Sequence, residues 1–466
     1  MTSRNRRAKD VQRILVSLTA CSAVTAAAAP SFAQTAKNPQ SQLAYAVDSS
    51  NGRPYLYGTT RAGGNILQPP YYNTYSNYGT LFKIQTDGQG YALLHSFQIN
   101  SDGNAPIGGM ILDATSNVLY GITNGNYGTG GTNRPSTFYS LAVSAPNAYD
   151  AILQPNFTDA TSNLTEVNGV FYGTAGYTIF SVSKGGSLLW TLPVVHGGFG
   201  ALTYGVDLNG VGWLYGASQS GGTNATGYVF KVQLDGTNFT VMWNFDALNT
   251  SHSPADNTDG AYPGALTLVQ GKLYGTAIGG GRYSYACSGI TYTSGGNGTL
   301  FSVDQNTGAF TLLHTFTGSW DLAGNCPGTD DGALPEGQLL QAVDCLGNPV
   351  LYGTTAKGGW YGDYPLPYSS YHAWNYGTIY QITVNPFTYQ EVRAFAGQST
   401  TYSNGTTPQE GAAPYASLTQ DPTSPTILYG TTSNGGRNNN GTVFAWDACN
   451  GNVRGPNSTF RWLYSF

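Results

Sequence analysis

The chain has 466 residues, of which only 9% are charged, and its formal net charge is −5. Gly (63 residues) and Tyr (34 residues) are abundant, so neutral polar groups must cover much of the surface. No cluster of Lys and Arg follows the N-terminal segment, which argues against nucleic-acid binding, because such binding needs a positively charged footprint. We expect a surface suited to neutral or weakly acidic ligands.

The first 33 residues have the composition of a secretory signal peptide. Basic residues precede an apolar, Ala-rich stretch from Ile14 to Ala29, and Ser31-Phe32-Ala33 offers the small residues that a signal peptidase reads. We predict a signal peptide over 1–33, a short linker over 34–41, and a secreted or periplasmic protein. Leu18 to Cys21 also fits a lipobox, so a lipoprotein attached through Cys21 is an alternative. A transmembrane anchor needs about 20 apolar residues, and Ser, Thr and Pro interrupt this stretch, so none is expected in the mature chain.

After this segment, a Tyr-Gly phrase recurs seven times. The copies are LYGTT at Leu56, LYGIT at Leu119, FYGTA at Phe171, LYGAS at Leu214, LYGTA at Leu273, and LYGTT at Leu351 and Leu428. The shortest interval, from Gly173 to Gly216, is a bare repeat unit, and the longer intervals carry insertions. A fixed internal period indicates one repeat array instead of several independent domains.

Three further β-rich runs accompany each Tyr-Gly phrase in constant order. We name the four runs strands a to d. Strand a is typified by QLAYAVD from Gln42, strand b by the Tyr-Gly phrase, strand c by GTLFKI from Gly79, and strand d by LLHSF from Leu93. Four short strands joined by turns predict an antiparallel meander, which must stack on its neighbours to bury both faces. We therefore predict an all-β, seven-bladed β-propeller of four-stranded blades over 42–466.

These phrases resemble the Gloeobacter/Verrucomicrobium-type tandem repeat of secreted bacterial "choice-of-anchor" proteins. Gly63-Gly64 with GTLFKI and LLHSF, Gly221-Gly222 with GYVFKV, and Asp259-Gly260 to Pro263 match its unit. The resemblance covers about residues 42 to 466. It implies a secreted, propeller-like protein and no particular activity.

The predicted topology places the connections on two unequal faces. Because neighbouring strands are antiparallel, all b–c and d–a connections emerge on one face, and all a–b and c–d turns emerge on the other. Long insertions belong to the first group, for example 65–77, 279–296 and 358–375. Since loops on a rigid scaffold commonly carry function, we expect ligand binding on this b–c/d–a face.

Four cysteines remain in the mature chain. Cys287 and Cys326 fall in connections of the b–c/d–a face, whereas Cys345 and Cys449 fall in turns of the opposite face. Disulfides Cys287–Cys326 and Cys345–Cys449 form the pairing that does not cross the disc, and an even count in an oxidising compartment favours disulfides. Free buried thiols are the alternative.

Aromatic residues crowd the insertions of the b–c/d–a face. Aromatic planes suit both sugar rings and protein hot spots, so we expect a glycan or another extracellular ligand, such as a surface protein, to bind there. Packing of the rings within their own loops is the competing interpretation. The predicted ligand-binding residues are Trp360, Tyr361, Tyr364, Tyr368, Trp374, Tyr71, Tyr72, Tyr75 and Tyr283.

Catalysis is the second hypothesis, as a polysaccharide lyase or a glycoside hydrolase. Such a lyase needs a His or Tyr base and a cation for the substrate's carboxylate, and His372, Tyr371 and Arg282 are weak candidates. A third hypothesis is a structural or adhesive surface protein. The sequence predicts no cofactor and no metal site, and it favours a non-catalytic protein.

Two recurring features have structural interpretations. His95 and His314 occupy the strand d position that we expect Trp190, Trp243 and Tyr464 to hold in other units. Asp-Gly steps followed by Pro, as at Asp259 and Asp331, recur in the d–a connections, where Asp-Gly is primarily a turn device and secondarily a calcium-ligand candidate.

Overall fold

The fold is that of a computed structural model. It describes residues 36–64, 78–98, 103–125, 135–153, 155, 158–160, 162–194, 197, 200–252, 255–287, 290–318, 331–359, 376–395, 410–449 and 460–466, and only the backbone within 283–295. All of these residues belong to one compact unit, Thr35–Phe466.

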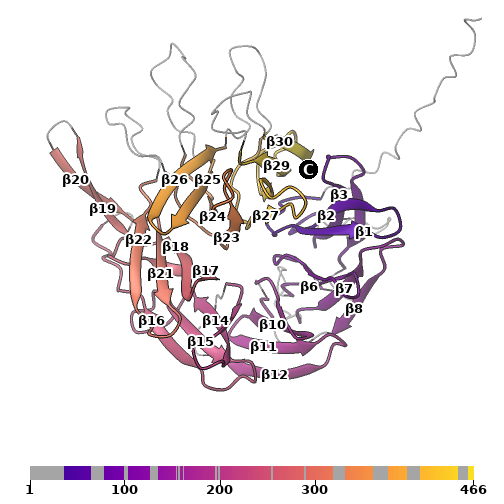
Figure 1. The fold of residues 1–466 in the computed structure, drawn as a ribbon, viewed down its shortest axis with the longest axis horizontal. Coiled ribbons are helices and arrows are strands. Elements are labelled where there is room, and N and C mark those ends of the chain that lie inside the picture. Colours follow the sequence, from indigo (N-terminus) through magenta and orange to yellow (C-terminus); the bar gives the residue numbers. More distant parts are fainter. Residues whose placement is uncertain are drawn as a thin grey trace, which may run out of the picture. The chain divides into compact units, whose positions relative to one another are not determined.

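The described residues form seven four-stranded antiparallel sheets, which confirms the predicted seven-bladed propeller. Figure 1 shows the sheets arranged in a ring in chain order. Blades 1 to 4 comprise β1 (Ala44–Asp48), β2 (Arg53–Thr60), β3 (Thr80–Gln85), β4 (Ala92–Ser96); β5 (Ile111–Asp113), β6 (Val118–Ile122), β7 (Phe138–Ala142), β8 (Tyr149–Leu153); β9 (Thr165–Val167), β10 (Val170–Ala175), β11 (Thr178–Ser183), β12 (Leu188–Pro193); β13 (Thr203–Val206), β14 (Gly212–Ser218), β15 (Tyr228–Gln233) and β16 (Thr240–Asn244).

The remaining three blades follow the same plan with one addition. They comprise β17 (Ala261–Val269), β18 (Lys272–Gly279), β21 (Thr299–Asp304), β22 (Phe310–Thr315); β23 (Leu340–Val343), β24 (Pro349–Thr355), β25 (Thr378–Val384), β26 (Phe387–Ala394); β27 (Thr419–Gln420), β28 (Ile427–Thr432), β29 (Thr442–Asp447) and β30 (Arg461–Ser465). A separate hairpin, β19 (Arg282–Cys287) with β20 (Ile290–Gly295), is inserted between strands b and c of blade 5.

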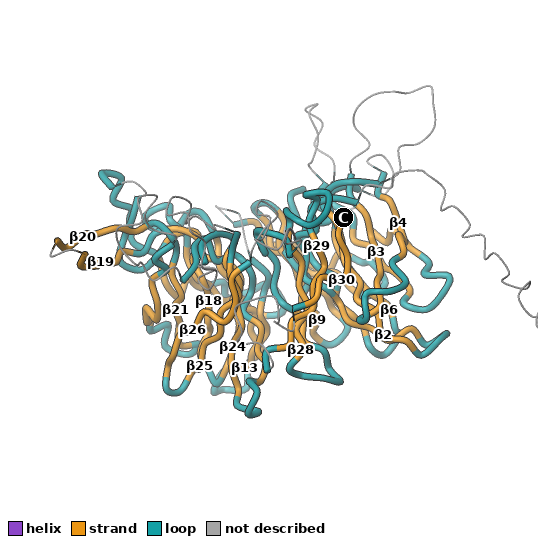
Figure 2. The backbone as a smooth tube through the Cα atoms, turned by 90° about the horizontal axis from the view of Figure 1, so that it is seen from above, coloured by secondary structure: helices purple, strands orange, loops and turns teal. Residues whose placement is uncertain are grey.

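Strand a is the innermost strand of each blade, and strand d is the outermost. Contacts between neighbouring blades include β1 with β5, β17 with β23, and β23 with β27, all of them pairs of a strands. Figure 2 shows the strands running between the two faces, with their connecting loops above and below them.

The glycine of the Tyr-Gly phrase gives room to an aromatic ring from strand c. A Cβ atom on Gly58 would lie 2.5 Å from Cζ of Phe82 and 2.8 Å from Cδ2 of Leu43. Gly216 has the same relation to Phe230 and Leu202. The phrase recurs because a buried ring sits directly on this backbone.

Threonines hold neighbouring blades together near the axis. The hydroxyl of Thr267 in strand a of blade 5 donates to the carbonyl of Leu339 at 2.6 Å, and Thr165 donates to the carbonyl of Leu202 at 2.5 Å. Thr419 of blade 7 donates to the carbonyl of Leu43 at 2.6 Å. The last bond crosses the junction between the two ends of the chain, so the same contact that joins successive blades also closes the ring.

The segment before β1 completes this closure. The amide of Asn38 donates to the carbonyl of Asn440 at 2.9 Å. The amides of Ala105 and Ala413 donate in the same way to carbonyls of the blades that precede them, at 2.6 and 2.8 Å. Each of these three residues has a positive φ and precedes a proline. Blade 7 takes all four of its strands from the C-terminal end of the chain, so within the described residues the ring is closed by packing and hydrogen bonds, without a strand exchanged between the chain ends.

The disulfide Cys345–Cys449 is confirmed. It joins the a–b turn of blade 6 to the β29–β30 connection of blade 7, and its sequence separation is 104 residues. The expectation that all long connections belong to the b–c/d–a face is wrong at this place. The β29–β30 connection is of the c–d type and runs from 448 to 460, so the opposite face has one long connection.

The expected equivalence of Trp190 with the strand d histidines is also wrong. His95, Trp243 and His314 pair with the second residue of strand c, next to a β-bulge, whereas blade 3 places Leu192 at that position. In blade 3 the bulge falls two residues later along strand c, and a bulge changes the register of everything beyond it. Trp190 instead donates from Nε1 to the carbonyl of Leu234 at 2.9 Å.

Candidate functional site

Most of the sequence-predicted site residues lie outside the described residues. This holds for Trp360, Tyr361, Tyr364, Tyr368, Trp374, Tyr71, Tyr72, Tyr75, Tyr371, His372 and Cys326. Tyr283 and Cys287 lie in β19, where only the backbone is described. Arg282 begins β19, and its Nε lies 3.9 Å from Oδ2 of Asp256. Arg282 is absent from the lining of the pocket described next.

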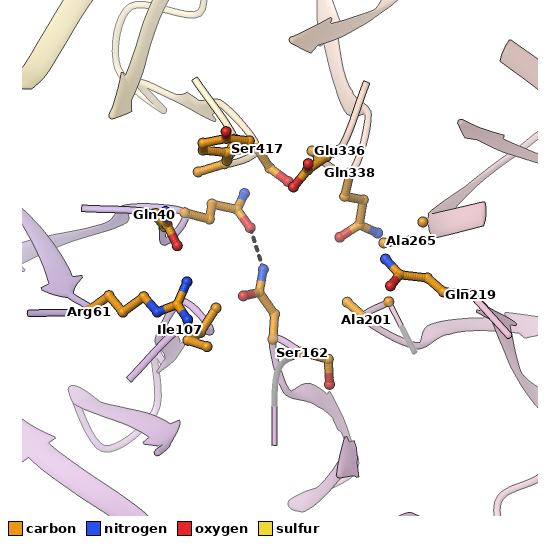
Figure 3. A pocket seen from close by; sticks show the side chains of 17 residues that line it. Gln40, Arg61, Ile107, Ser162, Ala201, Gln219, Ala265, Glu336, Gln338 and Ser417 are labelled. Atoms are coloured by element: carbon orange, nitrogen blue, oxygen red, sulfur yellow. Dashed lines mark hydrogen bonds between the residues drawn. The ribbon is translucent and has the colours of Figure 1, made fainter. Parts of the chain in front are cut away.

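A polar pocket of about 530 Å³ lies where all seven blades meet. It occupies the end at which strand a begins and strand b ends, which is the b–c/d–a face expected to bind ligand. Figure 3 shows side chains from several blades around its hollow. The lining comprises Gln40, Gln42, Arg61, Ile107, Ser162, Asn163, Gly200, Ala201, Gln219, Gly264, Ala265, Glu336, Gly337, Gln338, Tyr415, Ala416 and Ser417.

One equivalent position in every blade supplies the ring at the centre of this pocket. Each strand a is entered through a buried Leu or Met, such as Leu43 or Leu339, and the residue just before it faces the pocket. These seven residues are Gln42, Gly109, Asn163, Ala201, Ala265, Gln338 and Ser417; all but Gly109 are in the lining. Blades 1, 3 and 6 supply amide side chains, and the other four blades supply small residues that leave room for the hollow.

Two of the amides are used to hold the blades together. Nδ2 of Asn163 donates to Oε1 of Gln42 at 3.1 Å, drawn as the dashed line in Figure 3, and Nε2 of Gln42 donates to the carbonyl of Leu418 at 3.1 Å. Oδ1 of Asn163 accepts from the amide of Gly109 at 2.5 Å. The side-chain oxygen and nitrogen of Gln42 and of Asn163 all form hydrogen bonds within the protein. These two residues therefore give the pocket its shape.

Other polar groups of the lining have no such partner. Among the described residues, none forms a side-chain hydrogen bond with the amides of Gln40 and Gln219, the carboxyl of Glu336 or the hydroxyl of Tyr415. Gln338 donates to the carbonyl of Leu266 at 2.6 Å, and its Oε1 remains available. A polar group that stays unpaired in a partly buried site is costly unless a ligand or water satisfies it. These groups are therefore suited to ligand contact.

The lining contains one guanidinium and one carboxyl: Arg61 follows strand b of blade 1, and Glu336 lies at the entry to blade 6. Burial raises the pKa of Glu336 to about 7, because a desolvated carboxylate is disfavoured. Burial, and then the nearby charge of Glu336, raise the pKa of Tyr415. Near neutral pH the pocket thus contains a carboxyl, on Glu336, that gains or loses its proton.

The pocket lies on the face that the sequence predicts to bind ligand, but the sequence did not predict these lining residues. The signal was available as the run between Pro and Leu in the d–a connections, in Pro39 to Leu43 and Pro335 to Leu339. The sequence alone does not identify these residues as pocket residues, because single Gln and Glu residues at these places resemble turn residues. Their convergence becomes apparent only when the seven entries meet at the axis.

The Asp-Gly carboxylates are structural, as the turn interpretation predicted. Asp331 accepts from the backbone amide of Thr317 at 2.8 Å, and its Oδ2 lies 2.7 Å from Nε2 of His314. Asp259 accepts from Nε1 of Trp243 at 3.1 Å in the same arrangement. His314 also stacks on Tyr389, with ring centroids 4.0 Å apart. Each carboxylate therefore fastens the end of strand d to the following connection.

Within the described part of the chain, no group of three or more His, Cys, Asp or Glu side chains is placed to hold a metal ion. The same residues contain no helix long and apolar enough to cross a membrane.

Solved structures are similar to this chain at low sequence identity and with TM-scores below 0.5. An oligogalacturonate lyase in complex with manganese is 11% identical, with 88% of this chain and 98% of that chain covered and a TM-score of 0.44. Oligogalacturonate lyase from Vibrio parahaemolyticus is 8% identical, with coverages of 87% and 96% and a TM-score of 0.44. The WD40 domain of Neurospora crassa Pan2 is 12% identical, with coverages of 89% and 91% and a TM-score of 0.46.

No curated protein sequence matches this chain. The model of the Gloeobacter/Verrucomicrobia repeat matches residues 54–288, which is half of the chain and covers most of blade 1, blades 2 to 4 and part of blade 5. The Tyr-Gly phrases and their companion strands lie at equivalent places in every blade. The chain is therefore a member of the Gloeobacter/Verrucomicrobia repeat family.

Proposed function

We propose that this protein is secreted or periplasmic and binds a saccharide, without catalysis, in the axial pocket of the b–c/d–a face. The observation that carries the proposal is the set of available polar groups on Gln40, Gln219, Glu336 and Tyr415 around one hollow. Sugar hydroxyls both donate and accept hydrogen bonds, and amide side chains do the same. The volume of about 530 Å³ lies within the range of roughly 300–1,000 Å³ typical of small-molecule pockets.

Binding suits this lining better than hydrolysis does. Glycosidases generally use two carboxyl groups about 5 to 10 Å apart, and the described lining supplies one, on Glu336. Tyr415 adds an aromatic body with a polar tip, a combination that can pack against the C–H face of a sugar ring. The aromatic insertions that include Trp360 and Trp374 are proposed to extend the site outward from the same face.

A glycan array followed by calorimetric titration of the mature protein tests this proposal. We expect saturable binding with the sugar recovered unchanged. Gln219→Ala should weaken binding about tenfold or more, because it removes one available donor and one available acceptor. Gln390→Ala is the matched control, since Gln390 is exposed on the outer strand β26. Failure to bind any glycan, or release of shorter or unsaturated products, would overturn the proposal.

The contribution of the insertions needs its own variant. Changing both Trp360 and Trp374 to Ala should weaken binding of oligosaccharides more than binding of monosaccharides, because the rings would contact sugar units beyond the pocket. Unchanged oligosaccharide affinity would remove these two residues from the proposed site and leave the axial pocket in place.

Export has a separate test. N-terminal sequencing of the protein recovered outside the cytoplasm should begin at Gln34. A lipid-modified Cys21 at the N-terminus would show that the lipoprotein alternative holds instead.

A further inference from the structure

The guanidinium and the carboxyl of the pocket come from different blades. Arg61 follows β2 in blade 1, and Glu336 precedes β23 in blade 6, with blade 7 between them. Figure 3 shows both among the side chains that surround the hollow. A ligand in this pocket therefore meets a guanidinium on one side and a carboxyl on another.

The net charge of the lining depends on one proton. Guanidinium groups are positively charged at neutral pH, so Arg61 and Glu336 together contribute a charge of about +1 when Glu336 is protonated and about zero when it is ionised. Tyr415 of blade 7 is the titratable group next to Glu336. Blade 5 contributes Gly264 and Ala265 to the lining beside it, and neither residue titrates. Burial raises the pKa of Glu336 to about 7, so the change of charge falls in the neutral range.

The charged groups in the lining restrict which saccharides can bind, and this inference depends on the proposed saccharide-binding function. We propose that the axial pocket selects saccharides bearing a single carboxylate, and that it binds them more tightly when Glu336 is protonated. Arg61 would pair with the carboxylate, since a guanidinium presents two parallel donors to such a group. The amides of Gln40 and Gln219 would bind hydroxyls. A single guanidinium balances one negative charge, so the pocket suits a carboxylate better than a phosphate dianion.

The expected pH dependence follows from the population of protonated Glu336. If the ligand binds only to that form, apparent affinity scales with the protonated fraction. For a pKa of about 7, this fraction falls about tenfold between pH 6 and pH 8. Neutral sugars lack the repulsion with ionised Glu336 and should bind equally at both pH values.

Calorimetric titration with four probes at pH 6 and pH 8 tests the inference. The probes are glucuronate, galacturonate, glucose and glucose 6-phosphate. We expect uronate affinity to be about tenfold higher at pH 6, and higher than that of the other two probes at pH 6. Glu336→Gln should bind uronate with the same affinity at both pH values, because glutamine stays neutral.

The role of Arg61 is tested by a matched pair of arginine variants, one just after β2 and one at its start. Arg61→Gln should weaken uronate binding at pH 6 by about tenfold or more, and should weaken it more than it weakens glucose binding. Arg53→Gln changes an exposed arginine at the opposite end of β2 and should alter neither. Thermal melting of each variant checks that it is folded.

The outcomes separate this inference from the proposed function. Glucose binding with no preference for uronates, uronate binding that strengthens at pH 8, or tighter binding of glucose 6-phosphate would overturn the inference while saccharide binding stands. Absence of binding by every probe and by the glycan array would remove both.

Discussion

At the scale of single residues, Glu336 should make the stability of the free protein depend on pH. Its pKa is raised from the ordinary 4.5 to about 7 by burial, so the folded state holds this proton more tightly than the unfolded state does. A raised pKa contributes stability that is present below the unfolded value and is lost as pH rises through the folded value. The stability contributed by this proton is therefore lost between about pH 4.5 and pH 7.

We therefore predict that Glu336→Gln loses less stability than the unchanged protein between pH 5 and pH 8. The difference should be at most about 3 kcal/mol, because each pKa unit corresponds to about 1.4 kcal/mol. Urea unfolding at both pH values without ligand measures it. Equal pH dependence in the two proteins would show that Glu336 titrates normally.

Replacing Asp331 should lower the stability of the folded protein and leave ligand binding unchanged. Asp331→Ala removes the acceptor of the half-buried Thr317 amide and the partner of His314. We expect a loss of about 2–4 kcal/mol, measured by urea unfolding. Asp150→Ala, at an exposed position in β8, should cost less than about 0.5 kcal/mol. Similar costs for both would contradict the role assigned to Asp331.

At the scale of elements, the blade is built around the contact between the Tyr-Gly glycine and a strand c ring. Gly216→Ala would place a Cβ 2.5 Å from Cζ of Phe230, and neither strand can move without disturbing the next blade. We predict a loss of about 1–3 kcal/mol. Thermal unfolding measures this loss, with Gly185→Ala as the control. No atom lies within 4 Å of a Cβ at Gly185, so a melting temperature that falls equally in both would exclude the ring contact as the cause.

Strand identities could be predicted from the sequence, and strand registers could not. Every strand b and strand c appeared in the repeat, because the glycine and its facing ring leave a local signature. The position of Trp190 was mispredicted because a bulge in blade 3 lies two residues away from its place in the other blades. A bulge depends on hydrogen bonding between strands, which no single-strand pattern records.

At the scale of the whole molecule, the disulfide Cys345–Cys449 should stabilise the end of the chain against opening of the ring. It joins blades 6 and 7 across 104 residues, and a cross-link of this span is worth about 2–5 kcal/mol, chiefly by restricting the unfolded chain. Changing both cysteines to Ser should lower the unfolding midpoint accordingly. Under reducing conditions this variant and the unchanged protein should unfold alike, and a persistent difference between them would contradict the assignment.

The sequence by itself determined the all-β class, the number of blades, the order of strands and one disulfide pair. It could do so because each blade is a local unit that repeats its own packing contacts. Ring closure and the axial pocket were decided only by the tertiary structure. Gln40, Gln219, Glu336 and Tyr415 come from four blades and lie far apart in the chain, and nothing local marks them as neighbours. Whether an amide is available to a ligand, as in Gln219, or engaged between blades, as in Asn163, depends on which backbone groups the closed ring places beside it.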